Sequence, residues 1–199
     1  MSSGGAVYGN PDSIASIDEK YDKNPISSYG LTKLVAEEYI SFLMKNTSVK
    51  TFILRPSNVY GKYQNLKKPQ GLIGHVFKSV LIDQPITIYG DGTVVRDYLH
   101  VDDLSQAIIL CINNTKGSDN PIVLNVGSGI PTSINEVIIN ISEITHKKVN
   151  IIINPPREFD CKYNVLSIDK AWEVLGWQPN IDLKVGMKEE WEWILQEFS

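Results

Sequence analysis

The chain has 199 residues, of which 42% are hydrophobic and 21% are charged, with 19 lysines and arginines against 23 aspartates and glutamates. This is the composition of a folded globular protein, and it excludes an intrinsically disordered chain. Because the net charge is −4 and no dense basic run occurs, we expect no nucleic-acid partner.

The two cysteines, Cys111 and Cys161, lie far apart and have no Cys-x-x-Cys spacing. This pattern favours free thiols in a reducing compartment over a disulfide framework or a zinc site, and we expect no metal. No apolar run approaches the roughly 20 residues that span a bilayer. The opening residues 1–5 also lack the basic-then-apolar pattern of a signal peptide. We therefore expect a cytoplasmic protein with no membrane partner.

The first elements predicted along the chain are a strand end, a helix and a strand. The short apolar run at residues 6–8 precedes a Gly-Asn-Pro-Asp turn, which is typical of the end of a strand. Apolar residues then recur at helical spacing from residue 28 to about 45. Residues 51–55 form a buried-type strand that Pro56 ends. A helix followed by a strand is half of a βαβ unit.

The remainder of the chain continues as mixed α/β structure. Helices are expected over residues 72–82, 102–113, 133–144, 168–175 and 183–197, and strands over residues 86–89, 97–101, 122–126 and 149–153. Asp102 and Asp103 stand in the first turn of their helix, where the helix dipole favours acidic residues.

Tyr29 and Lys33 are the first candidates for chemistry. They are four residues apart at the start of the predicted helix at 28–45, so both side chains project from one face. A nearby ammonium stabilises a phenolate, which makes Tyr29 a candidate general base. The Tyr-x-x-x-Lys spacing also occurs by chance, and by itself it does not decide between catalysis and a packed tyrosine beside a surface lysine.

Neighbouring motifs give this pair a context. Residues 2–9 (SSGGAVYG) precede it and residues 54–61 (LRPSNVYG) follow it. In this order and spacing, the three motifs resemble the extended short-chain dehydrogenase/reductase family, in its NAD-dependent epimerase/dehydratase group. The similarity is greatest to the UDP-glucose 4-epimerase branch, and it continues through the rest of the chain in residues 88–92 (IYGDG), 96–103 (RDYLHVDD), 125–129 (NVGSG) and 175–179 (LGWQP).

The resemblance implies an α/β fold that contains the C-terminal part of a doubly wound Rossmann-type sheet and a smaller mixed α/β domain. Residues 1–62 would be the remnant of the NAD-binding domain, and residues 63–199 mainly the nucleotide-sugar-binding domain, with a strand and helix at about 97–126 returning to the Rossmann sheet. The chain would begin at the fifth strand, without the glycine-rich turn that binds the NAD phosphates. We interpret residues 127–129 (GSG) as a tight turn, because they come late and lack the third glycine.

The resemblance also assigns roles to individual residues. Tyr29 would take the proton from a sugar hydroxyl while NAD takes hydride from the same carbon. Lys33 would orient the nicotinamide ribose, and the backbone at Pro56 would lie against the nicotinamide. Asn58 resembles the residue that contacts the phosphates of the nucleotide sugar.

Two arginines and an aspartate complete the expected nucleotide-sugar site. A diphosphate needs permanently charged, multidentate donors, and the resemblance assigns this role to Arg96 and Arg157. Asp160 would reach the ribose. Tyr98 is expected to pack beneath the site, and His100 to serve as a structural hydrogen-bond donor.

The sequence departs from the family at its catalytic hydroxyl. The serine or threonine that bonds the reacting oxygen stands four residues before the tyrosine of Val-Tyr-Gly, and here that position is Gly4. Ser3 is adjacent, but neighbouring side chains of a strand point to opposite faces, so it cannot substitute without a backbone shift. Catalysis would then require that water or Ser3 serve in place of the missing side chain. The Asp-Glu pair of the 4,6-dehydratases is also missing, because Gly5 and Ala6 stand there.

We therefore expect a fragment of an NAD-dependent nucleotide-sugar epimerase, with a UDP-hexose as substrate and no activity on its own. One alternative is a noncatalytic nucleotide-sugar-binding module, which the missing cofactor segment and Gly4 favour. A decarboxylase or reductase of the same family is a second alternative, since it would share Tyr29 and Lys33. The family dimerises through a helix bundle that includes the Tyr29 helix, which makes a homodimer the candidate assembly.

Overall fold

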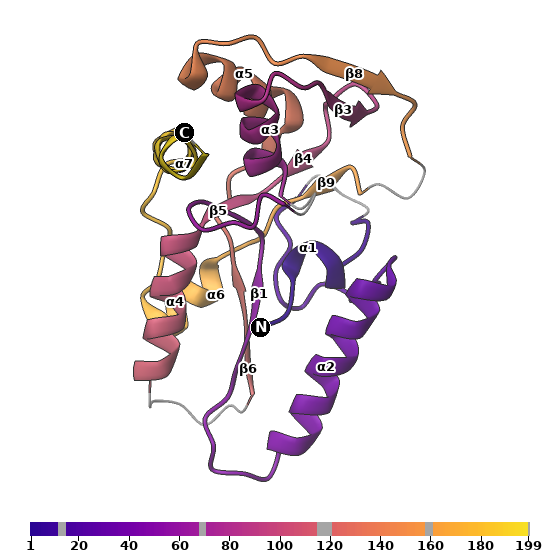
Figure 1. The fold of residues 1–199 in the computed structure, drawn as a ribbon. Coiled ribbons are helices and arrows are strands. Elements are labelled where there is room, and N and C mark those ends of the chain that lie inside the picture. Colours follow the sequence, from indigo (N-terminus) through magenta and orange to yellow (C-terminus); the bar gives the residue numbers. More distant parts are fainter. Residues whose placement is uncertain (12–14, 68–70, 115–120, 158–160, 199) are drawn as a thin grey trace.

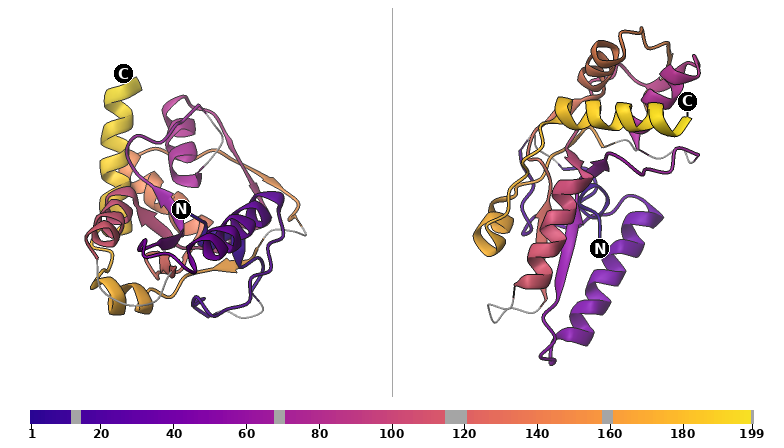
Figure 2. Two further views of the ribbon diagram at one scale, coloured as in Figure 1. Left: turned by 90° about the horizontal axis from the view of Figure 1, so that it is seen from below. Right: turned by 60° about the vertical axis from the view of Figure 1, so that its left-hand side comes forward.

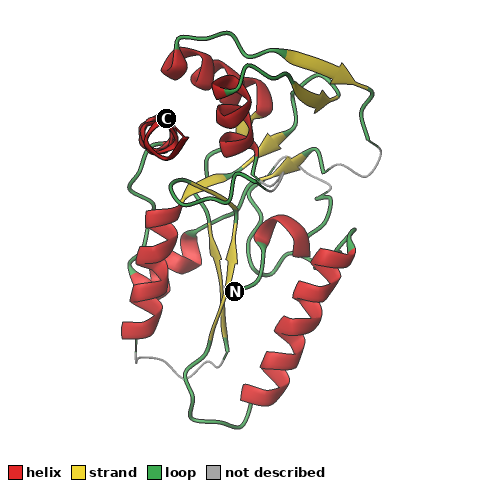
Figure 3. Cartoon of the chain, in the orientation of Figure 1, coloured by secondary structure: helices red, strands yellow, loops and turns green. Residues whose placement is uncertain are grey.

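A computed structural model describes residues 1–11, 15–67, 71–114, 121–157 and 161–198 of the chain. Helices and short parallel strands alternate along the sequence, which confirms the expected α/β fold class. In Figure 1 one long strand pair rises through the lower half of the molecule, and a group of helices with a second strand pair lies above it. Figure 3 separates the helices from the strands in the same view.

The lower half is built on two parallel strands. β1 (Phe52–Pro56) pairs with β6 (Ile122–Val126) from Phe52 opposite Ile122 to Pro56 opposite Val126. Helices α4 (Val101–Asn113) and α6 (Asp169–Leu175) cover one face of the pair. The burial of both strands explains their continuous apolar sequences. Their core consists of Leu54, Leu99, Leu104, Ala107, Cys111, Ile122, Leu124, Val126, Ala171 and Trp177.

Short strands connect the two halves. β2 (Asn58–Tyr60) pairs in parallel with β5 (Tyr98–His100), while β4 (Val95–Arg96) lies between β7 (Thr132–Ser133) and β9 (Tyr163–Asn164). The prediction of one alternating strand over 97–101 was wrong. The chain leaves one sheet at Arg96 and joins another at Tyr98, and α4 already begins at Val101.

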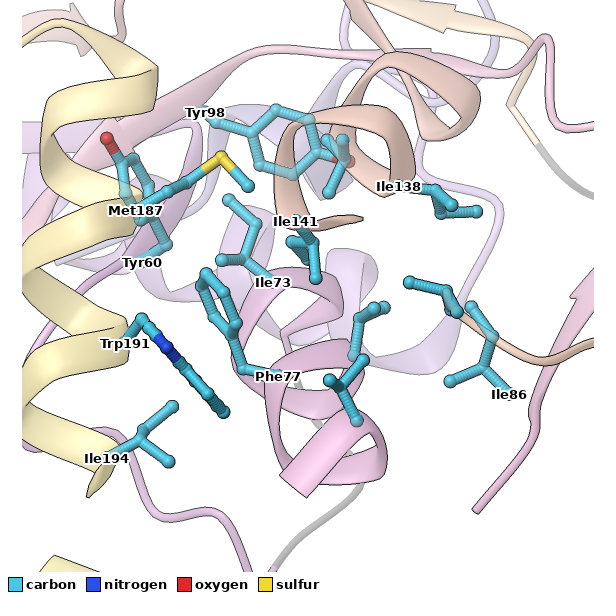
Figure 4. Close-up of a cluster of buried hydrophobic side chains, with 14 of the residues drawn as sticks. Tyr60, Ile73, Phe77, Ile86, Tyr98, Ile138, Ile141, Met187, Trp191 and Ile194 are labelled. Atoms are coloured by element: carbon cyan, nitrogen blue, oxygen red, sulfur yellow. The ribbon is translucent and has the colours of Figure 1, made fainter. Parts of the chain in front are cut away.

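The upper half packs three helices beside a parallel strand pair. β3 (Ile86–Tyr89) pairs with β8 (Ile151–Asn154), and α3 (Leu72–Leu81), α5 (Ile134–Thr145) and α7 (Leu183–Phe198) enclose an apolar core. In that core the rings of Phe77 and Trp191 stack with their centroids 5.3 Å apart (Figure 4). Figure 2 shows α7 crossing this half above α4.

The opening of the chain differs from its prediction. Residues Gly4–Val7 form a short helix, α1, and Ser3 before it is extended at φ −158°. Periodicity cannot separate a strand from a helix in an apolar run of three residues. Val7 and Tyr8 are fully buried, so the run is part of the core in either conformation.

Helix α2 (Ser28–Met44) confirms the expected helix and lies at the lower right of Figure 1, with its start beside α1. Gly30 lies so close to α1 that a Cβ there would come within 2.4 Å of the Ala6 carbonyl oxygen. A buried ion pair of 2.6 Å joins Glu37 to Arg55 on β1. Much of the helix surface is apolar and exposed, at Leu31, Val35, Tyr39, Phe42 and Leu43.

Arg55 extends this connection into a buried network. Its guanidinium donates to Glu37 and, over 2.8 Å, to the Tyr8 hydroxyl. Tyr8 in turn donates to Asn125 on β6 over 2.7 Å. Burial raises the pKa of Tyr8 to about 12, so the hydroxyl remains a donor. The network therefore fixes α2 to both strands of the lower sheet.

No helix among the described residues is both long and apolar enough to cross a membrane.

The buried ion pair should dominate the attachment of α2. Glu37→Gln leaves the Arg55 charge uncompensated at a site where the two side chains are 4% and 2% exposed. We expect a loss of about 3–5 kcal/mol of unfolding free energy, measured by urea denaturation. Lys23→Ala is the control, because it breaks an exposed ion pair to Glu38 and should cost under about 1 kcal/mol. Equal losses in the two variants would contradict this account.

Candidate active site

Most of the predicted site residues meet at one hollow between the two halves. This central cavity has a volume of about 730 Å³ and is lined by the start of α2, the β1–β2 junction, the start of α3 and strand β4. Five of the predicted residues line it, namely Tyr29, Lys33, Pro56, Asn58 and Arg96. Residues that are up to 67 positions apart in the sequence, from Tyr29 to Arg96, are thus brought together.

Tyr29 and Lys33 occupy the first turns of α2, where the Ser27 hydroxyl caps the helix by accepting from the Gly30 amide over 3.1 Å. The Lys33 ammonium lies 5.5 Å from the centre of the Tyr29 ring. It also donates to the Met1 carbonyl over 3.3 Å. Tyr29 is 57% exposed, so its hydroxyl is accessible to a ligand in the cavity.

Pro56 and Asn58 are placed by the passage from β1 to β2. Pro56 is buried as the last residue of β1, and Asn58 opens β2 two residues later. The backbone and side-chain amides of Asn58 each donate to the Asp97 carbonyl over 3.0 Å. These two hydrogen bonds fix the orientation of the Asn58 side chain at the cavity wall.

Arg96 brings a second cation to the cavity. Its guanidinium donates over 2.8 Å to the carbonyl of its neighbour Val95. No ion pair joins Arg96 or Lys33 to an acidic side chain of the described residues. Two cations without such a partner on one cavity favour an anionic ligand.

Arg157 lies in a second hollow that adjoins the first. This side cavity of about 800 Å³ is lined by Tyr89 and Gly90 at the end of β3, by residues 154–157 at the end of β8, and by Val94, which also lines the central cavity. The Arg157 guanidinium lies 3.4 Å from the centre of the Tyr89 ring, in cation–π contact. The predicted ribose ligand Asp160 lies outside the described residues.

The turn at residues 127–129 does not offer its amides to a phosphate. The Asp97 carboxylate accepts from the Ser128 and Gly129 amides over 2.7 and 3.1 Å. It also accepts from the Leu166 amide over 3.2 Å. An anion of the protein itself therefore fills this glycine-rich turn, which confirms its interpretation as a structural element.

Gly4 has no room for a side chain. A Cβ there would lie 2.5 Å from Leu166 Cδ1 and 3.1 Å from the Arg55 carbonyl oxygen. The sequence predicted that Ser3 could take the place of this side chain only if the backbone departs from a strand. Because the backbone turns into α1 after Ser3 and does not continue as a strand, Ser3 lines the central cavity together with Tyr29 and Lys33.

Tyr98 and His100 were expected to have structural roles. Tyr98 is buried, packs in the upper core and borders the central cavity, and burial raises its pKa to about 12. His100 caps α4, but its Nδ1 accepts from the Asp102 amide over 3.3 Å, so the expected hydrogen-bond donor is an acceptor at this atom.

Sequence reasoning missed several residues of the cavity wall. Gln64, Leu72 and Ile134 line it without belonging to any motif that we interpreted. Gln64 follows the Val-Tyr-Gly of residues 59–61, and only its distance from that motif could have suggested a role.

A tyrosine–lysine pair beside a cation-lined cavity in an α/β fold is the arrangement of a short-chain dehydrogenase/reductase site. The model of the NAD dependent epimerase/dehydratase family matches residues 1–127. The chain therefore belongs to the NAD-dependent epimerase/dehydratase family.

Individual relatives agree with this assignment. A putative UDP-glucose 4-epimerase of Methanocaldococcus jannaschii is 40% identical over 97% of the chain, and dTDP-4-dehydro-6-deoxyglucose reductase of Escherichia coli is 34% identical over 94%. The crystal structure of Thermotoga maritima UDP-glucose 4-epimerase with UDP-glucose superimposes over 100% of the chain with a TM-score of 0.91 and 33% identity. The chain spans 61%, 57% and 63% of these three proteins.

The family depends on NAD, and the residues present fit one end of that cofactor. Tyr29, Lys33 and Pro56 share one cavity, as contact with a nicotinamide riboside requires. The turn at 127–129 already holds Asp97, so in the described part of the chain it is not a pyrophosphate site. The fit is therefore to the nicotinamide end of NAD.

The packing of Gly4 gives a stability prediction. Gly4→Ser should cost about 1–3 kcal/mol, because the new Cβ forces Leu166 or the backbone at Arg55 to move. Gly5→Ser is the matched control, since nothing lies within 4 Å of a Cβ at that position. Thermal unfolding of the two variants tests this. A Gly4→Ser protein as stable as the original chain would show that the site can accept the family's hydroxyl.

Proposed function

We propose that the chain forms the substrate-binding and proton-transferring part of an NAD-dependent UDP-sugar 4-epimerase. The observation that carries the proposal is the convergence of Tyr29, Lys33, Asn58 and Arg96 on one cavity. Its chemistry fits a ligand with a negatively charged diphosphate and a sugar hydroxyl. The Thermotoga maritima relative, whose structure contains UDP-glucose, supports this choice of ligand.

Proton transfer is assigned to Tyr29. Its hydroxyl oxygen, as phenolate, takes the proton from a sugar hydroxyl, and the same group returns the proton when the sugar carbon is reduced again. Bound NAD supplies the complementary chemistry by accepting hydride from that carbon and returning it to the opposite face. Lys33 would stabilise the phenolate through its charge and would donate hydrogen bonds to the nicotinamide ribose, and the backbone at Pro56 would lie against the nicotinamide.

The ligand's diphosphate is assigned to Arg96, Asn58 and Arg157. Arg96 faces the central cavity and Arg157 the side cavity, and the two cavities meet at Val94. A nucleotide sugar can therefore place its sugar beside Tyr29 and its nucleoside beyond Val94. Asp160 would hold the ribose.

Ser3 is the group that we assign to the reacting oxygen in place of the missing side chain at Gly4. It lines the cavity beside Tyr29, and its hydroxyl makes no capping bond to α1. A serine hydroxyl both donates and accepts, so it suits an oxygen that loses and regains a proton.

A reductase is the second candidate, favoured by the 34% identity to the Escherichia coli dTDP-4-dehydro-6-deoxyglucose reductase. It would use the same pair, Tyr29 and Lys33, to protonate a keto sugar after hydride transfer. In either case the exposed apolar face of α2 is proposed to pair two copies of the protein.

Ligand affinity tests the charge of the cavity directly. We expect the 199-residue chain to bind UDP-glucose in isothermal titration calorimetry. Arg96→Met should weaken this binding by about tenfold or more, because a charge-assisted hydrogen bond contributes about 1.5–3 kcal/mol. Lys147→Met removes an exposed charge that does not line the central cavity, so it should leave the UDP-glucose affinity unchanged. An Arg96→Met variant with full affinity would contradict the proposed site.

Catalysis is tested in a chimera that places the cofactor-binding segment of the Methanocaldococcus jannaschii relative before Met1. We expect this chimera to interconvert UDP-glucose and UDP-galactose, which chromatography separates and measures. Tyr29→Phe should lower the rate by about 10²–10⁴, since positioned acid–base catalysis contributes that much. Tyr39→Phe on the exposed face of α2 is the control. Activity that survives Tyr29→Phe would refute the assignment, and turnover of a keto sugar with NADH alone would favour the reductase.

A further inference from the structure

Glu190 is an acid in the interior that the proposed reaction does not use. It lies on α7 and is fully buried. Neither of its carboxylate oxygens makes a hydrogen bond of ordinary geometry among the described residues. A buried carboxylate without partners is costly, so the group needs a structural explanation.

The position of Glu190 is directly behind the wall of the central cavity. A Cβ on Gly74 of α3 would lie 2.9 Å from Glu190 Oε1 and 2.8 Å from Gln64 Oε1. The carboxyl and the carboxamide therefore both border the space that Gly74 leaves open. Gln64 also lines the central cavity, so Glu190 lies close to a residue of the cavity wall.

The segment that carries Gln64 needs such support. Tyr63 has φ +68°, a left-handed conformation that costs free energy for a residue other than glycine. On its outer side the segment is held by an ion pair of 3.5 Å between Lys62 and Glu189. The adjacent acids of α7 thus contact the segment from two sides, Glu189 from outside and Glu190 from inside.

We propose that Glu190 is a positioning residue, which in its neutral form holds the segment 61–64 and fixes Gln64 at the wall of the central cavity. The carboxylic acid form has a donor that the carboxylate lacks, so it can bond an amide oxygen. The inference rests on the proposed function in one respect, namely that the central cavity binds a nucleotide sugar.

The charges around Glu190 favour its neutral form. The cations of the neighbouring elements are committed elsewhere, since Lys62 pairs with Glu189, Lys78 on α3 donates to the Leu66 carbonyl and Lys184 pairs with Glu143 on α5. Tyr60 and His100 also lie beside this part of α7, where both pack against Gly186. Asp103 and Asp182 are further acids near Tyr60, and their charge disfavours a second negative charge there.

Burial raises the pKa of Glu190 to about 8, against a smaller lowering by the Gly61 amide. The folded chain therefore keeps a proton that the unfolded chain loses near the ordinary glutamate pKa of 4.5. Stability falls as the pH rises through this window and becomes constant above the folded-state pKa. Near pH 8 and above, a buried negative charge would stand behind a cavity that binds anions.

The test follows the backbone amides of Gly61 and Gln64 by NMR from pH 6 to 9.5. In the original chain we expect both amides to shift in one step with a midpoint at about 8. Glu190→Gln, which keeps the shape and the donor, should remove the step. Glu192→Gln on the exposed side of the same helix should leave it in place.

UDP-glucose affinity between pH 7 and 9 gives the second measurement. It should weaken by up to about tenfold in the original chain, because apparent affinity scales with the fraction in the competent neutral form. In Glu190→Gln the affinity should stay constant with pH. The same pH slope in both proteins, or amides that do not titrate in the original chain, would overturn the proposal. If UDP-glucose does not bind at any pH, the proposed function fails, and the amide titration alone decides the role of Glu190.

Discussion

The buried carboxylate of Asp97 is the interaction on which the site depends. It accepts hydrogen bonds from the backbone amides of Ser128, Gly129 and Leu166. The backbone carbonyl of Asp97 accepts hydrogen bonds from the backbone and side-chain amides of Asn58. One residue thus joins the end of β6, the segment after β9 and the start of β2. This junction adds to the strand pairing of β2 with β5 and of β4 with β7 and β9 in placing the cavity residues.

The same junction determines where an anion can bind. The Ser128 and Gly129 amides would otherwise form a phosphate-binding turn, and Asp97 occupies it. Lys33 and Arg96, which make no ion pair among the described residues, lie instead on the central cavity. Asp97 therefore binds backbone amides of the protein, while its neighbour Arg96 lines the cavity.

Most of the fold could be predicted from the sequence, because long helices such as α2 and α7 show a helical spacing of apolar residues within their own sequence. The start of α1 could not, since four residues carry no period, and the change of sheet at Asp97 depends on partners that lie 31 and 69 positions away. The motif residues Tyr29, Lys33 and Arg96 could be predicted, and the cavity brings them together. Gln64 and Glu190 could not, because their proximity arises only from the packing of α3 against α7.

The buried acids of the protein differ in how their charge is neutralised. Glu37 forms an ion pair with the Arg55 guanidinium, and Asp97 accepts hydrogen bonds from backbone amides. Asp103 accepts hydrogen bonds from the Asn180 and Ile181 amides over 3.0 and 3.1 Å. Each of these acids joins two distant segments through these bonds. Glu190 has neither a cation nor a well-formed set of amides, so only protonation relieves its burial. Glu190 is therefore the buried acid whose protonation we link to the wall of the central cavity, since burial raises its pKa to about 8.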